Sequence, residues 1–470
     1  MNSVAIVGGG ITGLSAAFRL RQQNIPVTLY EAGDRVGGAI KTICENGFMA
    51  EWGPNTILET SPKIGALITD LGLDSRRWNS DPGANKNYIV RNGRMIRLPM
   101  NPLAFFATPL FSAAAKLRLC AEPFLRTPAQ SADESLADFV VRRLGREFLD
   151  YAINPFVSGI YAGDPARLSV RYAFPKLHAV EEKYGSLILG QFLGARERRK
   201  RAEVRKEAAK KVSFDNGLQV LTDTLHAQLG SAVELNTPVI AAQKTPEGWT
   251  VTVLANQREE QRKHSSVLLT APAQKLAGIR IEDGEAVSLA ALGEIEHPAV
   301  ARIVLGFRRE DVAYPLDGFG FLVPEVERLN ILGTTFSSSI FANRAPAGHV
   351  TLTSFIGGCR NPELAARDAD ELFDRTLQDL RRVLGVRGKP VYQHHVLFPA
   401  AIPQYNVGYG KFMDFMTEAE EKHPGLFFAG NYRNGISVGN SMVAGQEVAG
   451  RIANYCASDT QRRPSLEVLA

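Results

Sequence analysis

The chain has 470 residues, of which 45% are hydrophobic and 22% charged, the composition of a globular protein of two or three domains. That composition excludes a disordered, collagenous or disulfide-stapled protein. Lys and Arg number 54 against 49 Asp and Glu, and an excess of 5 is too small to predict a nucleic-acid partner. Residues 196–211 hold nine basic and three acidic side chains, so the excess is one local patch.

The first elements of the chain predict a dinucleotide-binding βαβ unit. An apolar strand at Val4–Val7 leads through a glycine-rich loop into a helix predicted over residues 14–23. A second strand is predicted over residues 25–31, and it ends in Glu31. This order places a pyrophosphate at the helix N-terminus and a ribose hydroxyl at the acid. The residues predicted to hold the dinucleotide are Gly8, Gly10, Ile11, Thr12, Gly13 and Glu31.

The glycines of this loop each have a physical task. Gly8 permits a tight turn, Gly10 lets the backbone approach the pyrophosphate, and Gly13 lets helix and strand pack closely. The charge of Glu31 would repel a 2′-phosphate, so the sequence disfavours a 2′-phosphorylated dinucleotide. Because strand, helix and acid occur in the required order, a glycine turn without a ligand is the weaker interpretation.

Residues 31–38 favour FAD over NAD. Glu31, Arg35, Gly37 and Gly38 form an ExxxRxGG pattern that resembles the extension found in FAD-containing amine oxidases and their relatives. Arg35 can neutralise phosphate charge, and a surface ion pair with Glu31 or Asp34 is the alternative. The resemblance places a second tight turn beside the flavin ring. It extends the predicted FAD contacts to Ala39, Trp52, Gly53, Pro54 and Asn55.

Residues 100–119 are mostly apolar, broken by Pro102 and Pro109, with Lys116 and Arg118 near the end. A buried core helix, an apolar substrate entrance and a monotopic membrane foot all fit this pattern, and composition alone favours the core. The sequence has no uninterrupted run of 18 or more apolar residues, so it predicts no membrane-spanning helix. The apolar run at residues 4–7 is too short for a signal peptide.

Motifs in the middle of the chain point to one family. The segments NPFVSGIYAGDP (residues 154–165), AFPKL (173–177) and GSLI (185–188) closely resemble protoporphyrinogen oxidases. So do GFGFLVP (318–324), LGTTFSSS (332–339), NRAP (343–346) and IPQY (402–405). These motifs cover nearly the whole chain in order. The chain is therefore similar to the oxygen-dependent, FAD-containing protoporphyrinogen and coproporphyrinogen oxidases.

The resemblance implies an α/β fold with a discontinuous, Rossmann-like FAD-binding domain, a mixed-sheet substrate domain and a helical domain. We assign residues 1–82, 212–285 and 390–458 to the FAD-binding domain and residues 83–99 and 286–389 to the substrate domain. Residues 100–211 form the helical domain, and residues 459–470 are a tail. In this setting a membrane foot at residues 100–119 becomes as reasonable as burial, and the basic patch becomes a candidate anionic-lipid contact, with a solvated helix face as the alternative.

Two further segments are expected at the flavin. A strand over residues 425–431 and a helix over residues 441–455 form a second strand–turn–helix, whose helix N-terminus would stabilise negative charge on a reduced flavin. It resembles the family's C-terminal flavin motif, and a plain βα unit is the alternative. The contacts predicted there are Asn431, Ile436, Ser437 and Val438. A strand over residues 233–242 carries Val239, whose backbone the resemblance places at the adenine.

The implied reaction is the six-electron oxidation of protoporphyrinogen IX to protoporphyrin IX in haem biosynthesis, with molecular oxygen as acceptor and hydrogen peroxide as product. Oxidation of coproporphyrinogen III is the alternative, and the sequence barely separates the two. The resemblance implies a cytoplasmic enzyme, and it leaves open peripheral contact with the cytoplasmic membrane and a homodimer. Gly320 and Leu322 match positions that line the ring pocket, although an ordinary strand explains both residues too.

Departures from the family affect the substrate side. Many relatives carry a basic residue near positions 55 or 87, where this chain has Asn55 and Asn87, so Lys86 and Arg91 become the candidates for holding a propionate. Gly408-Tyr409 replaces a common Gly-His pair, which removes a group that titrates near neutral pH. No acid–base pair stands out, so we predict no catalytic residue, and four cysteines without a CxxC pair predict no metal site.

Three other functions remain open at this point, one of which is a phytoene-desaturase-like enzyme, which shares the fold but acts on a long-chain substrate. A flavin amine oxidase shares both end motifs, and only the mid-chain motifs argue against it. A non-catalytic escort or scaffold protein would be expected to have lost loop glycines or Glu31, and this chain retains them.

Overall fold

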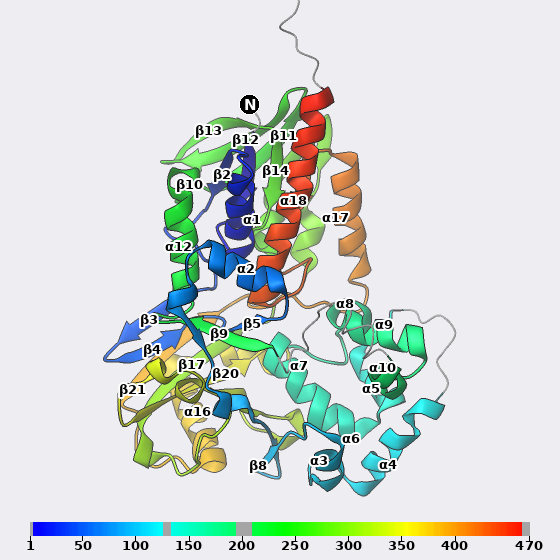
Figure 1. The fold of residues 1–470 in the computed structure, drawn as a ribbon, viewed down its shortest axis with the longest axis vertical. Coiled ribbons are helices and arrows are strands. Elements are labelled where there is room, and N and C mark those ends of the chain that lie inside the picture. Colours follow the sequence, from blue (N-terminus) through cyan, green and yellow to red (C-terminus); the bar gives the residue numbers. More distant parts are fainter. Residues whose placement is uncertain (1–2, 126–132, 194–208, 463–470) are drawn as a thin grey trace, which may run out of the picture.

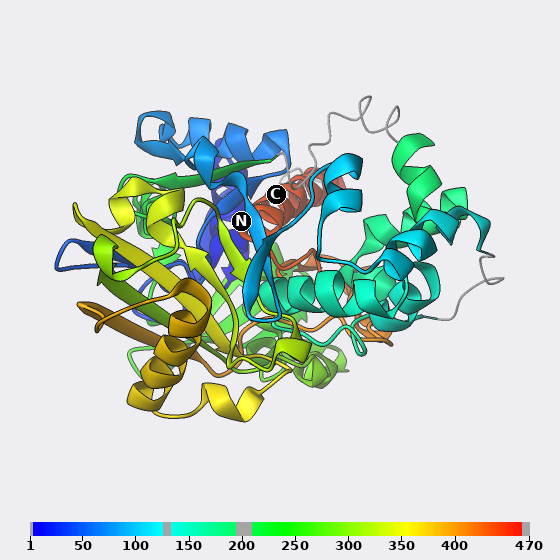
Figure 2. The same cartoon turned by 90° about the horizontal axis from the view of Figure 1, so that it is seen from below.

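The computed structural model describes residues 3–125, 133–193 and 209–462. A parallel sheet with long helices occupies one end of the molecule, and a seven-stranded sheet and a group of helices lie side by side at the other end (Figures 1 and 2).

A five-stranded parallel sheet gathers strands from the whole length of the chain. Its order is β10-β2-β1-β14-β22, with bounds Val233–Glu234, Val27–Tyr30, Val4–Val7, Ser266–Leu269 and Leu426–Phe428. One face packs against α1 (Ile11–Gln22), α2 (Pro62–Asp70), α12 (Gln219–Leu229) and α18 (Val438–Arg462). The other face is covered by a second sheet, so these strands are apolar almost throughout.

The second sheet has the order β13-β12-β11-β15-β16, with bounds Arg258–His264, Gly248–Ala255, Val239–Thr245, Arg280–Asp283 and Glu285–Val287. The predicted strand over residues 233–242 is therefore wrong as a single element. It divides into β10 and β11, because Asn236 turns with φ 51° and Pro238 cannot donate to a ladder. The chain thus passes from the parallel sheet to the second sheet just before Val239.

The seven-stranded sheet has the order β21-β17-β20-β19-β18-β7-β8. Its bounds are Tyr392–Phe398, Val300–Arg308, His349–Gly357, Ile331–Phe336, Gly320–Leu322, Asn87–Arg91 and Arg94–Arg97. Helix α16 (Ala369–Leu384) covers its back face. β21 pairs with β17, so residues 392–398 lie in this sheet, whereas the predicted boundary at residue 390 gave them to the FAD-binding domain.

Smaller elements connect these layers. A hairpin joins β3 (Thr42–Glu45) to β4 (Phe48–Glu51), and a three-stranded sheet combines β5 (Ile57–Glu59), β9 (Lys210–Phe214) and β6 (Arg77–Asn79). Short helices lie at α13 (Ala273–Leu276), α14 (Ser337–Ile340) and α15 (Pro362–Ala365), and α17 (Gly410–Lys422) precedes β22.

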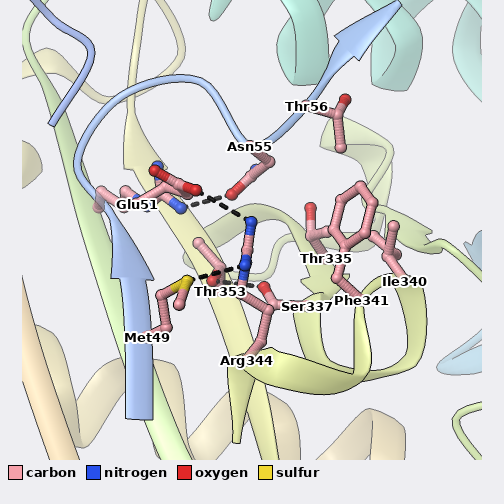
Figure 3. A pocket seen from close by; sticks show the side chains of 11 residues that line it. Met49, Glu51, Asn55, Thr56, Thr335, Ser337, Ile340, Phe341, Arg344 and Thr353 are labelled. Carbon is pink, nitrogen blue, oxygen red and sulfur yellow. Dashed lines mark hydrogen bonds and ion pairs between the residues drawn. The ribbon is translucent and has the colours of Figure 1, made fainter. Parts of the chain in front are cut away.

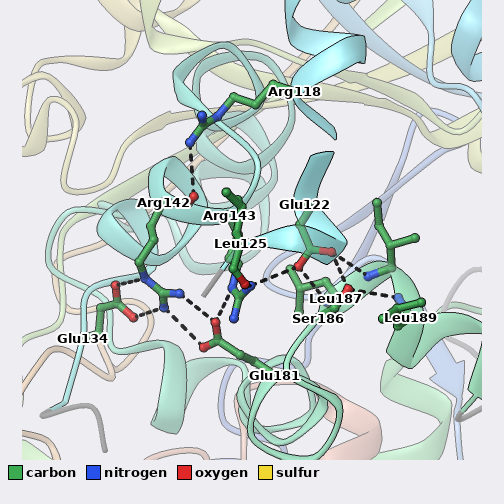
Figure 4. A network of polar contacts seen from close by, with 11 residues as sticks. Arg118, Glu122, Leu125, Glu134, Arg142, Arg143, Glu181, Ser186, Leu187 and Leu189 are labelled. Carbon is green, nitrogen blue, oxygen red and sulfur yellow. Dashed lines mark hydrogen bonds and ion pairs between the residues drawn. The ribbon is translucent and has the colours of Figure 1, made fainter. Parts of the chain in front are cut away.

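The helical region contains α3 (Pro102–Ala107), α4 (Ala113–Ala121), α5 (Leu136–Arg143), α6 (Arg146–Phe148), α7 (Asn154–Tyr161), α8 (Val170–Ala173), α9 (Pro175–Tyr184) and α10 (Leu187–Leu193). A buried ion network ties it together (Figure 4). Arg143 and Glu122 are fully buried, and Glu181 accepts hydrogen bonds from both Arg142 and Arg143. Glu122 in turn accepts from Ser186 and the backbone N–H of Leu187, at the start of α10.

One prediction about this region needs correction. Residues 100–119 do not form a buried helix: they divide between α3 and α4, neither of which has a buried residue, and only the connection holds buried side chains. The reason is that apolar composition alone does not show whether another part of the fold covers these side chains. The basic patch lies outside the described residues except for residues 209–211. At the C-terminal end, α18 runs to Arg462, beyond the predicted end at residue 455.

Candidate functional site

The glycine loop after β1 has the geometry of a phosphate cradle. Gly8 has φ +111°, which gives the tight turn, and a Cβ on Gly13 would lie less than 3.0 Å from the Gly8 carbonyl oxygen. A Cβ on Gly10, by contrast, would meet no heavy atom within 4 Å. The loop is therefore closed toward the sheet and open at Gly10, beside the N-terminus of α1, where an anion is stabilised.

Glu31 connects this loop to the segment that runs from β10 to β11. Its carboxylate accepts hydrogen bonds from the backbone N–H of Gly9 at 2.7 Å and of Gly33 at 2.8 Å, which leaves each oxygen a further lone pair for a hydroxyl. Its own N–H donates to the Glu234 carbonyl, and its carbonyl accepts from the N–H of Thr237. The start of β11, with Val239 buried, follows directly. The two predicted nucleoside contacts, Glu31 and Val239, therefore lie on adjoining backbone.

Arg35 folds the loop that follows rather than pairing with an acid. Its guanidinium donates to the carbonyls of Val36, Gly38 and Ile40, so the alternative of a surface ion pair is wrong. The Gly37 N–H donates to the Gly9 carbonyl at 2.8 Å. A Cβ on Gly38 would lie 3.7 Å from the Cα of Gly10, so both glycines border the same open space.

The turn at residues 52–55 packs on this loop. A Cβ on Gly53 would lie less than 3.0 Å from the Ala39 carbonyl oxygen, and the indole N–H of Trp52 is buried with no partner in the described part of the chain. Pro54 and Asn55 complete the turn. The guanidinium of Arg302, on β17, donates to the Gly53 carbonyl and to Oδ1 of Asn55.

The C-terminal strand–turn–helix arrives at the same place. The Tyr405 hydroxyl donates to the Asn431 carbonyl and accepts from the Gly435 N–H at 3.0 Å, which fixes the loop that carries Ile436. The Ser437 hydroxyl accepts from the Asn440 N–H and caps the start of α18 at Val438. Helix α18 packs on α1 so closely that a Cβ on Gly445 would overlap the Thr12 carbonyl.

These features fit FAD. The open cradle at Gly10, the carboxylate with spare lone pairs and two helix N-termini supply what a pyrophosphate, a ribose and an anionic ring require. The pieces come from four regions of the sequence and converge at the carboxyl ends of β1, β2 and β22, where open α/β sheets bind ligands.

A polar cavity lies behind the turn, lined by residues of β4, β17, β19, β20 and the 335–344 segment (Figure 3). Glu51 and Arg344, each with 3% of the side chain exposed, form an ion pair at 3.0 Å. Burial raises the pKa of Glu51, while Arg344 and the Thr42 hydroxyl oppose that shift. Burial also lowers the pKa of Arg302 to about 9. None of these three residues was predicted, although a charged residue within the apolar strand VARIVLGFR was a usable signal.

The front face of the seven-stranded sheet is the face opposite to α16, and the predicted substrate residues line it only in part. Leu322 faces α7, where a Cβ on Gly159 would touch its side chain, and Phe355 lies on the same face. Gly320 has φ +150°, and a Cβ there would overlap the Thr334 carbonyl of β19. The neighbouring strand therefore requires a glycine at position 320, whatever lies in front of it.

Lys86 and Arg91 are not free cations. Lys86 forms an ion pair with Asp317, and Arg91 pairs with Glu147 at 2.6 Å while its guanidinium lies 4.2 Å from the centre of the Tyr151 ring. Asn87 is placed on the front face instead, in register with Gly320. The basic candidates nearest to this face are thus neutralised by carboxylates.

Comparisons with known proteins relate this chain to a family of flavoproteins. Residues 11–453 match the family model "Flavin containing amine oxidoreductase". The chain is 35% identical to protoporphyrinogen oxidase 2 of Arabidopsis thaliana, with 98% of this chain and 96% of that protein covered. It is 28% identical to coproporphyrinogen III oxidase of Bacillus subtilis, with 96% and 98% covered. The solved structure named "Putative protoporphyrinogen oxidase" from Exiguobacterium sp. 255-15 superposes with a TM-score of 0.79 at 24% identity, over 96% of this chain and 98% of that one.

Proposed function

The chain belongs to the porphyrinogen oxidases of the flavin-containing amine oxidoreductase family, and we propose that its substrate is protoporphyrinogen IX. It is an FAD-dependent oxidase. The proposed reaction removes six electrons from the macrocycle in three rounds and passes them to molecular oxygen as hydrogen peroxide. Oxidation of coproporphyrinogen III is the competing assignment, because relatives with that name match over the same length.

The side chains on the front face of the sheet are the basis for choosing between the two substrates. The register places Ile89, Leu322 and Phe355 in one row of this face, and Asn87 is uncharged where many relatives have a base. Coproporphyrinogen carries four propionates and protoporphyrinogen two. This row of carbon side chains, and the pairing of Lys86 and Arg91 with carboxylates, suit the substrate with fewer carboxylates, and Arg302, next to Phe355 in register, is a further cation of the face.

The chain's residues would divide the work between holding the cofactor and holding the ring. Bound FAD supplies the hydride acceptor, and the residues at the open cradle, Glu31 and the 52–55 turn would hold it. Leu322 and Phe355 would hold the flat macrocycle and exclude water from it. We assign no catalytic base, since Asn55, the polar side chain at the turn, is an amide and does not titrate.

A fluorescence assay of porphyrin formation in air, with the two porphyrinogens side by side, tests the proposal. We expect kcat/KM for protoporphyrinogen to exceed that for coproporphyrinogen. Leu322→Asn should lower that value with FAD content unchanged, whereas the matched control Val326→Asn, at an exposed side chain just beyond β18, should not. A preference for coproporphyrinogen would replace the proposed substrate. Turnover no faster than autoxidation would remove both, and amines would be assayed next.

We also propose that α3 and α4 rest on the cytoplasmic membrane surface. Leu103, Phe106, Leu117 and Phe124 are exposed by 85%, 56%, 72% and 87%. Lys116 and Arg118 donate to backbone carbonyls beside them, so cations border the apolar side chains. Such a surface suits the interface of an anionic bilayer. No helix in the part of the chain that the structure describes is long and apolar enough to cross a bilayer.

Flotation with phosphatidylglycerol-containing vesicles tests this contact. We expect the wild type to float and the Leu103→Ser/Leu117→Ser variant to remain in the lower fractions. A Val391→Ser/Val407→Ser variant, altered at exposed apolar side chains elsewhere, is the control and should float. Flotation of all three proteins alike would exclude the proposed surface. Light scattering without vesicles would measure whether the predicted homodimer forms.

A further inference from the structure

One buried cation at the proposed flavin turn forms no ion pair with any of the described residues. Arg302 lies within β17 on the front face and is 1% exposed. Its two terminal nitrogens donate to the Gly53 carbonyl and to Oδ1 of Asn55, and both acceptors are neutral. Its Nε is buried and has no partner among the described residues. The Phe355 ring, 5.6 Å from the guanidinium carbon, closes the remaining side.

The carboxylate of the same cavity, that of Glu51, already has an ion-pair partner and hydrogen-bond donors. Glu51 pairs with Arg344 at 3.0 Å and also accepts from the Thr42 hydroxyl and the Leu218 N–H. The cavity behind the turn therefore holds two guanidinium groups and one carboxylate. Because a buried charge is costly without compensation, this arrangement leaves a net positive charge that an electron-rich group at the turn would stabilise.

The contact with Arg302 also fixes the direction of the Asn55 amide. A guanidinium only donates hydrogen bonds, so the amide oxygen must face Arg302 and the amide nitrogen must point away from it. The two N–H donors of Asn55 therefore do not face Arg302 and remain available to another acceptor. An arginine that holds two points of one turn sets both the position of the turn and its polarity.

We propose that Arg302 is a positioning residue that raises the reduction potential of the bound flavin, by orienting Asn55 and by its uncompensated charge. The inference rests on the proposed function only in placing the flavin ring at the 52–55 turn. A preorganised positive charge in a water-excluded site favours the reduced cofactor, which carries more negative charge than the oxidised one. A substrate carboxylate would attract the same cation, and the experiment separates the two roles.

The test is the reduction potential of the FAD-loaded protein, measured by anaerobic titration against a reference dye without any porphyrinogen. Arg302→Met should lower the equilibrium constant for two-electron reduction at least tenfold, or about 30 mV. Arg302→Lys, which retains the charge but loses the fork, should show a smaller decrease. Arg309→Met is the matched control, because Arg309 follows the same strand and likewise donates to two neutral oxygens, the backbone carbonyls of Val312 and Tyr314. Its potential should equal that of the wild type.

A change of the opposite sign guards against a merely structural effect. Glu51→Gln removes the one carboxylate of the cavity and should raise the potential, and it carries the test if Arg302→Met does not fold. Equal potentials for Arg302→Met and Arg309→Met, or a decrease in Glu51→Gln, would overturn the inference. An Arg302→Met enzyme with an unchanged potential and a raised KM would assign the cation to a substrate carboxylate instead. Because no porphyrinogen is present, loss of the proposed substrate would leave this result intact.

Discussion

The two inner glycines of the phosphate loop predict opposite outcomes on substitution, and Gly10→Val tests the cofactor site alone. A Cβ on Gly10 meets no heavy atom within 4 Å, and the residue has φ −70° and ψ 172°, which valine readily adopts. The apo-protein should therefore lose about 1 kcal/mol or less, the cost of a poorer helix cap. The added carbons would occupy the space proposed for the pyrophosphate. We expect FAD affinity to fall at least 100-fold, or about 2.8 kcal/mol.

Gly13→Ala should do the reverse. Its Cβ would lie less than 3.0 Å from both the Gly8 carbonyl oxygen and the Thr270 hydroxyl, and neither can move without shifting β1 or β14. Overpacking of this kind costs about 2 kcal/mol, so the apo-protein should unfold at a lower urea concentration. Tryptophan fluorescence measures unfolding, and quenching of free FAD measures binding. A Gly10→Val protein that binds FAD within threefold of the wild type would refute the placement of the pyrophosphate.

Three other substitutions probe separate parts of the molecule. Glu181→Gln should destabilise the protein by about 3 kcal/mol in thermal unfolding at pH 7, since the buried Arg143 and the half-buried Arg142 each lose one carboxylate partner. Burial alone would raise the pKa of Glu181, but the arginines of α5 hold that pKa below its usual value. The stabilisation by the Glu181 carboxylate is therefore present at neutral pH and is lost as pH falls through the lowered pKa. The Glu181→Gln variant should lack this part of the acid dependence. Tyr405→Phe removes two hydrogen bonds to the 431–435 loop and should destabilise the FAD-bound protein by about 1 kcal/mol. FAD should therefore be released at a lower urea concentration. Asn87→Arg adds a cation to the front face and should shift the ratio of kcat/KM about tenfold toward coproporphyrinogen; an unchanged ratio would mean that this face does not contact the propionates.

The cofactor side of the fold could be predicted because its signals are local. A four-residue apolar strand, three glycines at fixed spacing and an acid at the end of the next strand lie within the first 31 residues. The structure has β1 at the predicted residues, and α1 begins three residues before the predicted start and ends one residue before the predicted end. The second strand–turn–helix near the C-terminal end was also found, since a strand followed by small residues and a helix is again a pattern within one short segment.

What could not be predicted depends on partners far apart in the chain. Arg91 looked available in the sequence, and Glu147 neutralises it from 56 residues away. Arg302 looked like one more charge at a strand, and its contact with Asn55 spans 247 residues. The apolar count of residues 100–119 could not reveal that the described part of the chain buries no side chain of α3 or α4. In each case the missing information was the identity of the neighbour.

The order of strands in the parallel sheet has a consequence for biogenesis. Its outer strand β22 and the helix that packs on α1 come from residues 426–462, so the flavin pocket lacks one wall until nearly all of the chain has emerged from the ribosome. Until then the face of α1 that packs on α18 and the outer edge of β14 lack their partners, which lie far away in the sequence, and contacts of such high sequence separation form slowly. A complete pocket for FAD therefore exists only once β22 and α18 have joined the sheet.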